Sequence, residues 1–388
     1  MKLLEMESNI IKPVTVGILG GGQLARMTAI AAYKLGLQIA VLDPEPDSPA
    51  QQIAHLKVVG SLNDAYMLET LARISNIITL ENEFVDAPLL KHLESIGACV
   101  YPTANTVGLV QDKLLQKQLL ESRGISVPPF IGVSSYEDIY KAGEEFGWPL
   151  VLKARRNGYD GRGNVLVKEP SEALSAWDKL RGAKNQLMVE TFIRFKKELA
   201  VMVVRGVSGE MATYPVVETI QKDHICHIVK APAEVSTRVY EKAISISRQA
   251  IEAVSGIGIF GVEMFLLDDD NVLINELAPR PHNSGHYTIE ACFTSQFENH
   301  LRAILGFPLG STSMVLPAAV MVNLLGTRDG FATVSGLEKA SKIPGVNVHI
   351  YGKKITHPGR KMGHITVLGK NIDEALEKAI KAANLISF

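Results

Sequence analysis

The chain has 388 residues, with 40 Lys and Arg against 41 Asp and Glu, so its formal net charge is −1. A balanced charge gives no general attraction to nucleic acid, and this length can bury two or three separate cores. No apolar stretch of signal-peptide type opens the chain, and no run approaches the length of a membrane span. Three scattered cysteines without CxxC spacing favour a reducing compartment. We therefore expect a soluble, cytoplasmic protein with no nucleic-acid or membrane partner.

Apolar runs alternate with helical stretches through residues 1–112, which predicts a parallel sheet with helical crossovers. The expected strands are 14–19, 38–42, 57–59, 77–80 and 99–101, and the expected helices end at Leu35 or span 63–74 and 87–96.

A glycine loop, Gly20-Gly21-Gly22-Gln23, follows the first strand, and Asp43 ends the second. This arrangement imitates a dinucleotide-binding fingerprint, which an NAD-dependent oxidoreductase would carry. A glycine loop at a helix N-terminus also binds other phosphates, or is simply a tight turn, so these alternatives stay open.

Acidic residues follow the strand 77–80 in the run Glu81-Asn82-Glu83. Polar residues at the carboxyl end of a parallel strand lie where open α/β sheets bind ligands. Either glutamate could reach a substrate, and a solvated loop is the alternative.

A glycine- and arginine-rich loop, residues 155–164, separates a strand over 149–154 from one over 165–167. It therefore closes a hairpin, which excludes a P-loop at this place. We expect it to fold over phosphates, with Lys153 as a point charge and Lys113 at the start of a helix to Arg123. An exposed hairpin tip is the alternative.

Further strands are expected at 186–190, 198–204 and 211–217, and a helix at 239–254. The connector Thr191-Phe192-Ile193 runs on from Glu190 and could bind an adenine through its backbone, while Glu198 could take ribose hydroxyls.

Two apolar runs flank Asp268-Asp269-Asp270-Asn271, which predicts a hairpin. If Leu267 pairs with Val272, the register places Glu263 directly opposite Glu276. We expect both acids on the face of Phe265, Leu267, Val272 and Ile274.

Two like charges on a mostly apolar face need a cation, and Asn275 adds an amide oxygen beside Glu276. The hairpin therefore predicts a Mg²⁺ site completed by substrate phosphates. A slipped register with one solvent-facing glutamate is the alternative.

The last segment, 311–388, predicts a small α+β module with strands at 317–323, 346–350 and 364–368 and a closing helix at 373–382. Lys353, Arg360 and Lys361 fall on its loops, where a solvated basic loop is the ordinary interpretation.

Taken in order, these residues resemble the ATP-grasp pattern: Lys113, Lys153, Gly158-Tyr159-Asp160-Gly161-Arg162-Gly163, Glu190, Glu198, Glu263 and Asn275-Glu276. More specifically, the chain resembles the N5-carboxyaminoimidazole ribonucleotide synthetase family of purine biosynthesis. The glycine loop through Leu24, the Tyr-Asp-Gly-Arg-Gly loop, and the run from Asn275 through Arg280, His282, Asn283 and His286 carry this resemblance. It covers nearly the whole chain, with Ala25, Gln221 and His357 as departures at positions where the family usually has Gly, His and Arg.

The resemblance implies three domains: a Rossmann-like pre-ATP-grasp domain over 1–112, an ATP-grasp domain over 113–310 and an α+β domain over 311–388. It implies carboxylation of 5-aminoimidazole ribonucleotide with ATP and bicarbonate, through carboxyphosphate, and a homodimer. ATP would bind with Mg²⁺, as one or two ions for which Mn²⁺ could substitute. Other ATP-grasp ligases that use formate or biotin, an NAD oxidoreductase and a non-catalytic nucleotide-binding module are the rival classes.

The residue roles that the resemblance implies fall into four groups. ATP would contact Lys113, Lys153, Gly158, Tyr159, Asp160, Gly161, Arg162, Gly163, Glu190, Thr191, Phe192, Ile193, Glu198, Gln221, Asn275 and Glu276. The metal would take Glu263 and Glu276. Bicarbonate and carboxyphosphate would lie at Arg280, His282 and Asn283, with Asp160 as a candidate proton acceptor. The imidazole nucleotide would contact Gly22, Gln23, Glu81, Tyr159, Arg162, Lys353 and Arg360.

Overall fold

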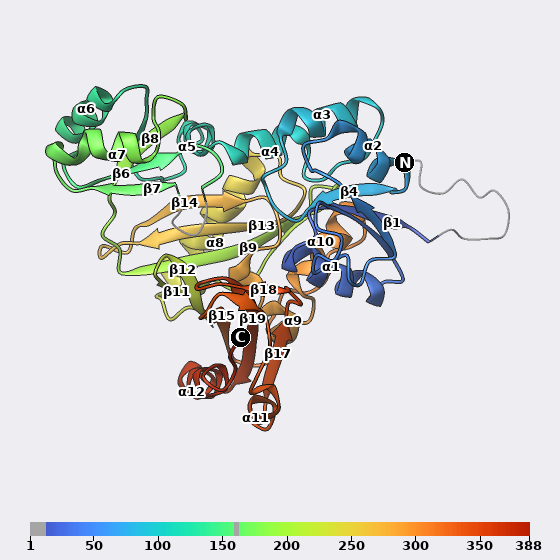
Figure 1. The fold of residues 1–388 in the computed structure, drawn as a ribbon. Helices are drawn as coiled ribbons and strands as arrows, with labels where there is room; N and C mark the ends of the chain where they lie inside the picture. Colours follow the sequence, from blue (N-terminus) through green and yellow to red (C-terminus); the bar gives the residue numbers. More distant parts are fainter. Residues whose placement is uncertain (1–12, 159–162) are drawn as a thin grey trace.

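The structure is a computed structural model that describes residues 13–158 and 163–388. The expected three-domain layout is confirmed, with an N-terminal parallel sheet, a central region of two sheets and a C-terminal region (Figure 1). The N-terminal sheet lies at one end of the molecule, a small helix-covered lobe at the other, and the C-terminal helices lie below both.

The N-terminal sheet is wholly parallel, in the strand order β3-β2-β1-β4. Its strands are β1 (Thr15–Leu19), β2 (Gln38–Asp43), β3 (Leu56–Val59) and β4 (Ile77–Leu80), and its helices are α1 (Gln23–Lys34), α2 (Ala65–Arg73) and α3 (Ala87–Ser95). The strand expected at 99–101 is reduced to one parallel bridge from Val100 to Ile78. Helix α4 (Ala104–Gln111), which the sequence pattern did not reveal, leads out of this domain.

The small lobe holds a four-stranded antiparallel sheet in the order β5-β8-β6-β7. It consists of β5 (Phe130–Val133), β6 (Leu150–Ala154), β7 (Asn164–Val167) and β8 (Leu187–Thr191), with α6 (Tyr136–Phe146) and α7 (Ala173–Lys179) packed on it. Because β6 and β7 pair antiparallel, the predicted hairpin around the glycine- and arginine-rich loop is confirmed.

The large sheet runs in the order β14-β13-β9-β11-β12-β15-β19-β17, with β10 also paired to β9. Its central strands are β9 (Lys197–Arg205), β10 (Met211–Thr213), β11 (Val217–Lys222), β12 (Ile225–Ala231), β13 (Gly258–Leu266) and β14 (Val272–Ala278). One strand expected over 211–217 is in fact two, because Pro215 cannot donate to a sheet ladder.

The C-terminal strands extend this same sheet, since β15 (Ala318–Leu325) pairs with β12 and then with β19 (Lys361–Gly369). Strand β17 (Val346–Ile350) forms the edge, and α12 (Ile372–Ala383) shares the C-terminal apolar core. The remaining elements are α5 (Lys113–Ser122), α8 (Thr237–Ala253), α9 (Thr288–Ala291), α10 (Gln296–Leu305), α11 (Leu337–Ser341), β16 (Gly330–Phe331) and β18 (Ile355–Thr356).

Helix α10 joins the central region to the N-terminal domain, and Figure 1 shows it beside α1. Phe297, Leu301 and Ile304 belong to the same apolar core as α1. The buried His300 adds a polar link, because its Nε2 lies 2.8 Å from Thr79 Oγ1 and its Nδ1 accepts from the Ile259 amide at 3.1 Å. The N-terminal domain therefore shares one apolar core with α10, and the loop after β4 reaches the segment after β14 through Glu83 and Arg280.

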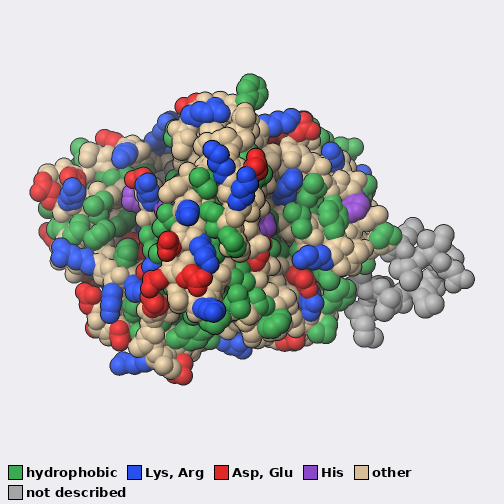
Figure 2. Space-filling view, turned by 90° about the horizontal axis from the view of Figure 1, so that it is seen from below, with side chains coloured by type: hydrophobic (Ala, Val, Ile, Leu, Met, Phe, Trp, Pro, Cys, Tyr) green, Lys and Arg blue, Asp and Glu red, His purple; other side chains and the backbone are tan. Residues whose placement is uncertain are grey.

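The surface carries charges of both signs. On the face drawn in Figure 2, Lys and Arg side chains alternate with Asp and Glu and with apolar residues. Within residues 13–158 and 163–388, no helix is long and apolar enough to cross a membrane.

Candidate active site

The hairpin of β13 and β14 places Glu263 directly opposite Glu276, as predicted. The register at the turn differs from the predicted one, because Leu266 rather than Leu267 faces Val272. A β-bulge beyond Glu263 skips one residue of β14, Asn275, and this offset restores the pairing of the two acids.

Because of the bulge, the predicted face is wrong for three of the four residues expected beside the acids. Val272 and Ile274 lie in the apolar core with Met264 and Leu266, on the side away from the acids, and Leu267 lies outside the strand. Phe265 alone of the four predicted neighbours alternates with Glu263 on the less buried face. An extra residue in one strand lets consecutive side chains leave the strict alternation of a ladder.

The two acids differ in charge state. Burial, with the nearby charge of Glu276 as a second cause, raises the pKa of Glu263 to about 8. Burial also acts on Glu276, but the charge and hydrogen bond of Lys113 outweigh it and lower the pKa of Glu276 to about 2. Glu263 therefore holds a proton at neutral pH until a cation enters between the acids.

This donor set fits Mg²⁺. Two carboxylates and the amide oxygen of Asn275 are hard oxygen ligands, and Mg²⁺ in nucleotide sites takes one or two carboxylates plus phosphates and water. In the described ranges, no group of three or more His, Cys, Asp or Glu is arranged to hold a metal ion.

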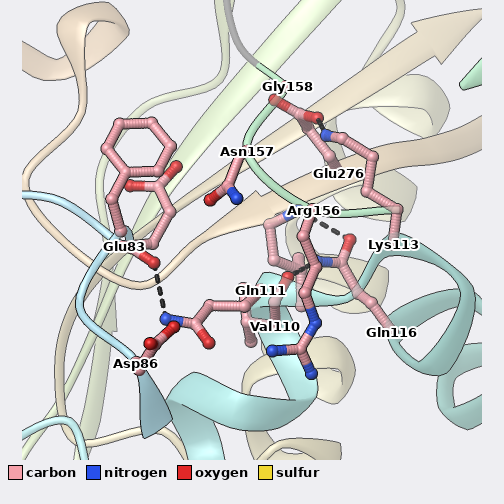
Figure 3. Close-up of a pocket in the computed structure, with 12 residues that line it drawn as sticks. Glu83, Asp86, Val110, Gln111, Lys113, Gln116, Arg156, Asn157, Gly158 and Glu276 are labelled. Carbon is pink, nitrogen blue, oxygen red and sulfur yellow. Dashed lines mark hydrogen bonds and ion pairs between the residues drawn. The ribbon is translucent and has the colours of Figure 1, made fainter. Parts of the chain in front are cut away.

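Three lysines form ion pairs at the site, one with Glu276 and two with Glu190. Lys113, at the start of α5, forms an ion pair with Glu276, and Figure 3 shows the two side chains pointing toward each other. Lys153, on β6, donates to Asn275 Oδ1 at 3.4 Å and pairs with Glu190. Lys117, one turn along α5 from Lys113, pairs with the other oxygen of Glu190.

Asp112 fixes the start of α5. Its carboxylate caps the helix by accepting from the Leu114 amide at 3.1 Å and binds Arg155 at two points, 2.9 Å to Nε and 2.6 Å to Nη2. Burial alone would raise the pKa of Asp112, but the hydrogen bond and charge of Arg155 bring it below its usual range. Because the Lys113 amide also donates to the Arg155 carbonyl at 2.9 Å, this cluster ties Lys113 to the end of β6.

The first end of the predicted phosphate loop, residues 155–164, lies beside Lys113 and Glu276. Gly158 lines a cavity of about 50 Å³ together with Lys113, Arg156 and Glu276 (Figure 3). A Cβ on Gly163 would lie 3.3 Å from the Gly158 Cα, so the two ends of the loop come close together. The predicted contacts of Tyr159, Asp160, Gly161 and Arg162 lie outside the described residues.

The connector after β8 borders a second cavity of about 320 Å³, whose lining includes Trp148, Thr191, Phe192 and Ile193. The amides of Thr191 and Phe192 already donate to Pro129 and Pro149 carbonyls, at 3.0 and 3.2 Å. Backbone recognition of a base would therefore fall to the Ile193 amide and to the carbonyls of the connector.

Glu198 lies on β9, next to the hairpin. Burial raises its pKa, and a hydrogen bond with Gln221 of β11 partly offsets the shift. Gln221, which stands where the family usually has His, thus contacts Glu198, the residue predicted to bind the ribose of ATP.

Arg280 is held by Glu83, one of the two acids after β4 for which the sequence allows a substrate contact. Arg280 Nη2 donates to Glu83 Oε1 at 2.9 Å, and its Nε pairs with the second oxygen, while Nη1 donates to the Pro281 carbonyl at 3.3 Å. One edge of the guanidinium is therefore occupied, and a bound anion would meet the opposite edge formed by Nη1 and Nη2 or would displace Glu83.

His282 is neutral and firmly placed. Burial, then the charges of Arg280 and Lys361, lower its pKa to about 3. Its Nδ1 accepts from the Ser284 amide at 3.4 Å, and its Nε2 lies 3.4 Å from Glu263 Oε1. The buried carboxamide of Gln296 accepts from its backbone amide at 3.0 Å and donates to its carbonyl at 2.8 Å.

Asn283 follows in a short 3-10 turn and is buried, and its Nδ2 is among the buried side-chain atoms that have no partner within the described residues. The side chain of Asn283 also lies near the buried Cys226 thiol, a weak acceptor that an oxygen of a ligand could replace.

Carboxylates of the protein fill the N-terminal glycine loop. The Gly21 amide donates to Asp43 at 2.7 Å, and the Leu24 amide donates to Glu81 at 3.4 Å. A Cβ on Gly22 would lie 2.3 Å from Glu81 Oε1, so the glycine is required for the close approach. A pyrophosphate at this helix end would meet two acids, which disfavours the dinucleotide interpretation.

The C-terminal loop with Lys353 docks on the segment that follows β2. Gln52 donates to the Gly352 carbonyl at 2.7 Å, and Lys354 pairs with Asp47 at 2.6 Å. Lys353 Nζ donates to the Lys361 carbonyl at 2.8 Å, and Arg360 Nη1 donates to the Ile355 carbonyl at 2.7 Å. The fold thus brings the predicted substrate residues of the two terminal domains to one side of the site.

Sequence patterns missed Lys117 and Gln296, and they did not link Glu83 to Arg280. Lys117 stands between the buried Leu114 and Leu120 on one face of α5, and a lysine in that register is a usable signal. Glu83 was one of two candidate acids after β4, whereas nothing in the sequence pattern marks Gln296.

Three family models match the chain in order. They are the ribonucleotide synthetase preATP-grasp domain over residues 14–111, the ATP-grasp domain over 118–297 and the phosphoribosylaminoimidazole carboxylase C-terminal domain over 319–378. The fold and the site therefore define an ATP-grasp ligase.

Individual relatives identify the family within the ATP-grasp ligases. The N5-carboxyaminoimidazole ribonucleotide synthase of Synechococcus elongatus is 42% identical over 366 residues, which cover 93% of this chain and 91% of that protein. A solved N5-carboxyaminoimidazole synthase from Aspergillus clavatus, in complex with ADP and 5-aminoimidazole ribonucleotide, superposes with a TM-score of 0.88 at 38% identity, over 96% of this chain and 99% of that one. The chain belongs to the N5-carboxyaminoimidazole ribonucleotide synthetase family.

Some relatives are longer. The phosphoribosylaminoimidazole carboxylase of Candida glabrata is 45% identical over 372 residues, which cover 93% of this chain and 64% of that protein. The chain thus spans about two thirds of the length of such relatives.

Proposed function

We propose that the chain carboxylates 5-aminoimidazole ribonucleotide with ATP and bicarbonate, and releases N5-carboxyaminoimidazole ribonucleotide, ADP and phosphate. The single observation that carries this proposal is the pairing of Glu263 with Glu276 below Lys113 and Lys153, in a chain whose relative binds ADP and the imidazole nucleotide. We also propose the domains 1–112, 113–310 and 311–388, a homodimer and a cytoplasmic location.

ATP would lie with its phosphates over the hairpin. Lys113 contacts Glu276 and Lys153 contacts Asn275, and both lysines can exchange these contacts for contacts with phosphate oxygens. Mg²⁺, held by Glu263 and Glu276, would neutralise charge on the transferred phosphoryl group. The adenine would use the connector at Ile193, and Glu198 the ribose hydroxyls.

Bicarbonate would bind at Arg280, His282 and Asn283. The edge of the Arg280 guanidinium formed by Nη1 and Nη2 matches a planar carboxylate once Nη1 releases the Pro281 carbonyl, and the Asn283 amide can donate to a remaining oxygen. A bicarbonate oxygen attacks the γ-phosphorus in line while the bond to the ADP oxygen breaks, which yields carboxyphosphate.

Carboxyphosphate is unstable in water, so the loop between Gly158 and Gly163 would have to exclude solvent. Its breakdown releases CO₂ and phosphate, and the exocyclic amine of the imidazole nucleotide attacks CO₂ and loses a proton. Glu81, Gly22, Gln23, Lys353 and Arg360 would hold this nucleotide. Asp160 is proposed as the proton acceptor, because His282 is too weakly basic to hold a proton at neutral pH.

The test is an ADP-release assay with ATP, Mg²⁺ and bicarbonate, run with and without 5-aminoimidazole ribonucleotide. We expect turnover that requires the nucleotide and that Glu276→Gln abolishes while the fold stays intact. ADP release that depends on formate, or that ignores the nucleotide, would reject the proposal.

A further inference from the structure

Glu190 is a buried carboxylate shared by two lysines. Its Oε2 lies 3.0 Å from Lys117 Nζ and its Oε1 pairs with Lys153, and the Lys117 and Glu190 side chains are only 2% and 4% exposed. We propose that Lys117 is a positioning residue for ATP. It pairs with Glu190, so that Glu190 does not offset the whole positive charge that Lys153 presents to the phosphates. The inference rests on the proposed use of ATP by this site.

Lys117 cannot itself be a ligand. It lies on the inner face of α5 with Leu114 and Leu120, and its ammonium group is enclosed by the protein. Burial of an ammonium without function is costly, so a buried lysine that pairs with one carboxylate needs a reason to remain.

The charge balance supplies that reason. One carboxylate between two ammonium groups leaves a net charge of +1, whereas Glu190 and Lys153 alone would be neutral. Burial lowers the pKa of Lys117 to about 8, against the attraction of Glu190, so Lys117 is still mainly charged at neutral pH. The positive field of the cluster therefore depends on Lys117, although Lys153 alone reaches the site.

The geometry gives that charge a direction. Lys153 Nζ also donates to Asn275 Oδ1 at 3.4 Å, beside Glu276, so it lies between the buried Glu190 and the hairpin acids. With Lys117 behind it, Glu190 divides its attraction between two cations. Without Lys117, Glu190 would bind Lys153 alone and draw its charge away from the nucleotide.

The experiment measures ADP binding by calorimetry in the presence of Mg²⁺, which needs neither bicarbonate nor the imidazole nucleotide. Lys117→Met keeps the length of the side chain and removes its charge, and we expect the Kd for ADP to rise about tenfold. Lys117→Arg keeps the charge at this position, and we expect its Kd for ADP to stay within about threefold of the original value. Lys141→Met, at an exposed surface pair, is the matched control and should bind ADP normally.

Two outcomes would overturn the inference. The first is a Lys117→Met protein that binds ADP as tightly as the original chain. The second is a Lys117→Arg protein, which keeps the charge, that loses as much affinity as Lys117→Met, because packing would then explain the loss. If the charge pattern holds while turnover does not require the imidazole nucleotide, the proposed substrate fails and the role of Lys117 stands.

Discussion

Glu83 and Arg280 form a two-point ion pair between the loop after β4 and the segment after β14. The pair joins the N-terminal domain, which would hold the imidazole nucleotide, to the arginine proposed for bicarbonate. Both side chains are mostly buried, and the burial of Arg280 would lower its pKa if Glu83 did not raise it. One contact therefore links the two proposed substrate sites, and a substitution can break it.

Glu83→Gln removes the charge and keeps the shape. We expect the KM for bicarbonate to rise about tenfold, because Arg280 loses its orientation, and the free energy of unfolding to fall by about 1–3 kcal/mol. Initial rates against bicarbonate and urea unfolding measure the two effects. Glu69→Gln, at the surface pair with Arg73, is the control and should change neither. An unaltered KM for bicarbonate would contradict the role given to Glu83.

Metal affinity should depend on pH through Glu263. The cation needs both carboxylates ionised, but Glu263 is protonated below pH 8 in the free protein. We expect Mn²⁺, measured by electron paramagnetic resonance with ADP present, to bind about tenfold more tightly for each pH unit up to about pH 8, with one proton released. Glu263→Gln should bind weakly at every pH, and an affinity that is flat between pH 6 and 8 would refute the prediction.

The proton on Glu263 also makes the free energy of unfolding depend on pH, but this free energy falls with rising pH whereas metal affinity rises. The folded state holds the Glu263 proton more tightly than the unfolded chain, whose reference pKa is 4.5, so this contribution is present below pH 4.5 and is lost as the pH rises to about 8. We expect Glu263→Gln to reduce the fall in metal-free stability between pH 5 and 8, as measured by denaturant titration. The original chain and the variant having the same pH slope would be the contrary result.

Asp112→Asn separates helix capping from ion pairing. Asparagine still caps α5, but it cannot neutralise Arg155, so we expect a loss of about 1–3 kcal/mol and a raised KM for ATP. The matched control is Asp64→Asn, since Asp64 is an exposed helix cap that accepts from the Tyr66 amide, and it should change stability by less than about 0.5 kcal/mol. Equal losses of stability in the two variants would show that the ion pair of Asp112 with Arg155 adds nothing to stability.

Gly22→Ala tests the nucleotide side of the site. The new methyl group would meet Glu81 Oε1 and push that carboxylate from its place. We expect a KM for the imidazole nucleotide raised at least tenfold, with the Kd for ADP unaltered. Gly206→Ala, where a Cβ would meet the flexible Glu210 at 3.3 Å, serves as the control. A parallel loss of ADP affinity would instead indicate that the glycine loop serves ATP.

The sequence predicts what depends on local pattern. Glu263 and Glu276 could be paired because a hairpin register needs only two apolar runs and a turn. The bulge at Asn275 could not be predicted, because the skipped residue depends on how both faces pack in the folded sheet. Two compensating differences, at the turn and at the bulge, leave the acids opposite each other.

Long-range contacts were the least predictable. Lys117 and Glu190 are 73 positions apart, and Glu83 and Arg280 are 197 apart, so no periodicity connects them. Lys117 was visible only as a charged residue on an apolar helical face, which has several explanations. Pro215, by contrast, was a local signal that the single strand expected at 211–217 should have been divided.

The pairing of β15 with β12 has a consequence for shortened forms of the chain. A protein ending near residue 310 would leave the edge of β12 from Ile228 to Ala231 without its partner strand, with unpaired amide and carbonyl groups and with Ile228 uncovered. Such an edge recruits strands from other molecules. Truncation at this boundary should therefore yield aggregates.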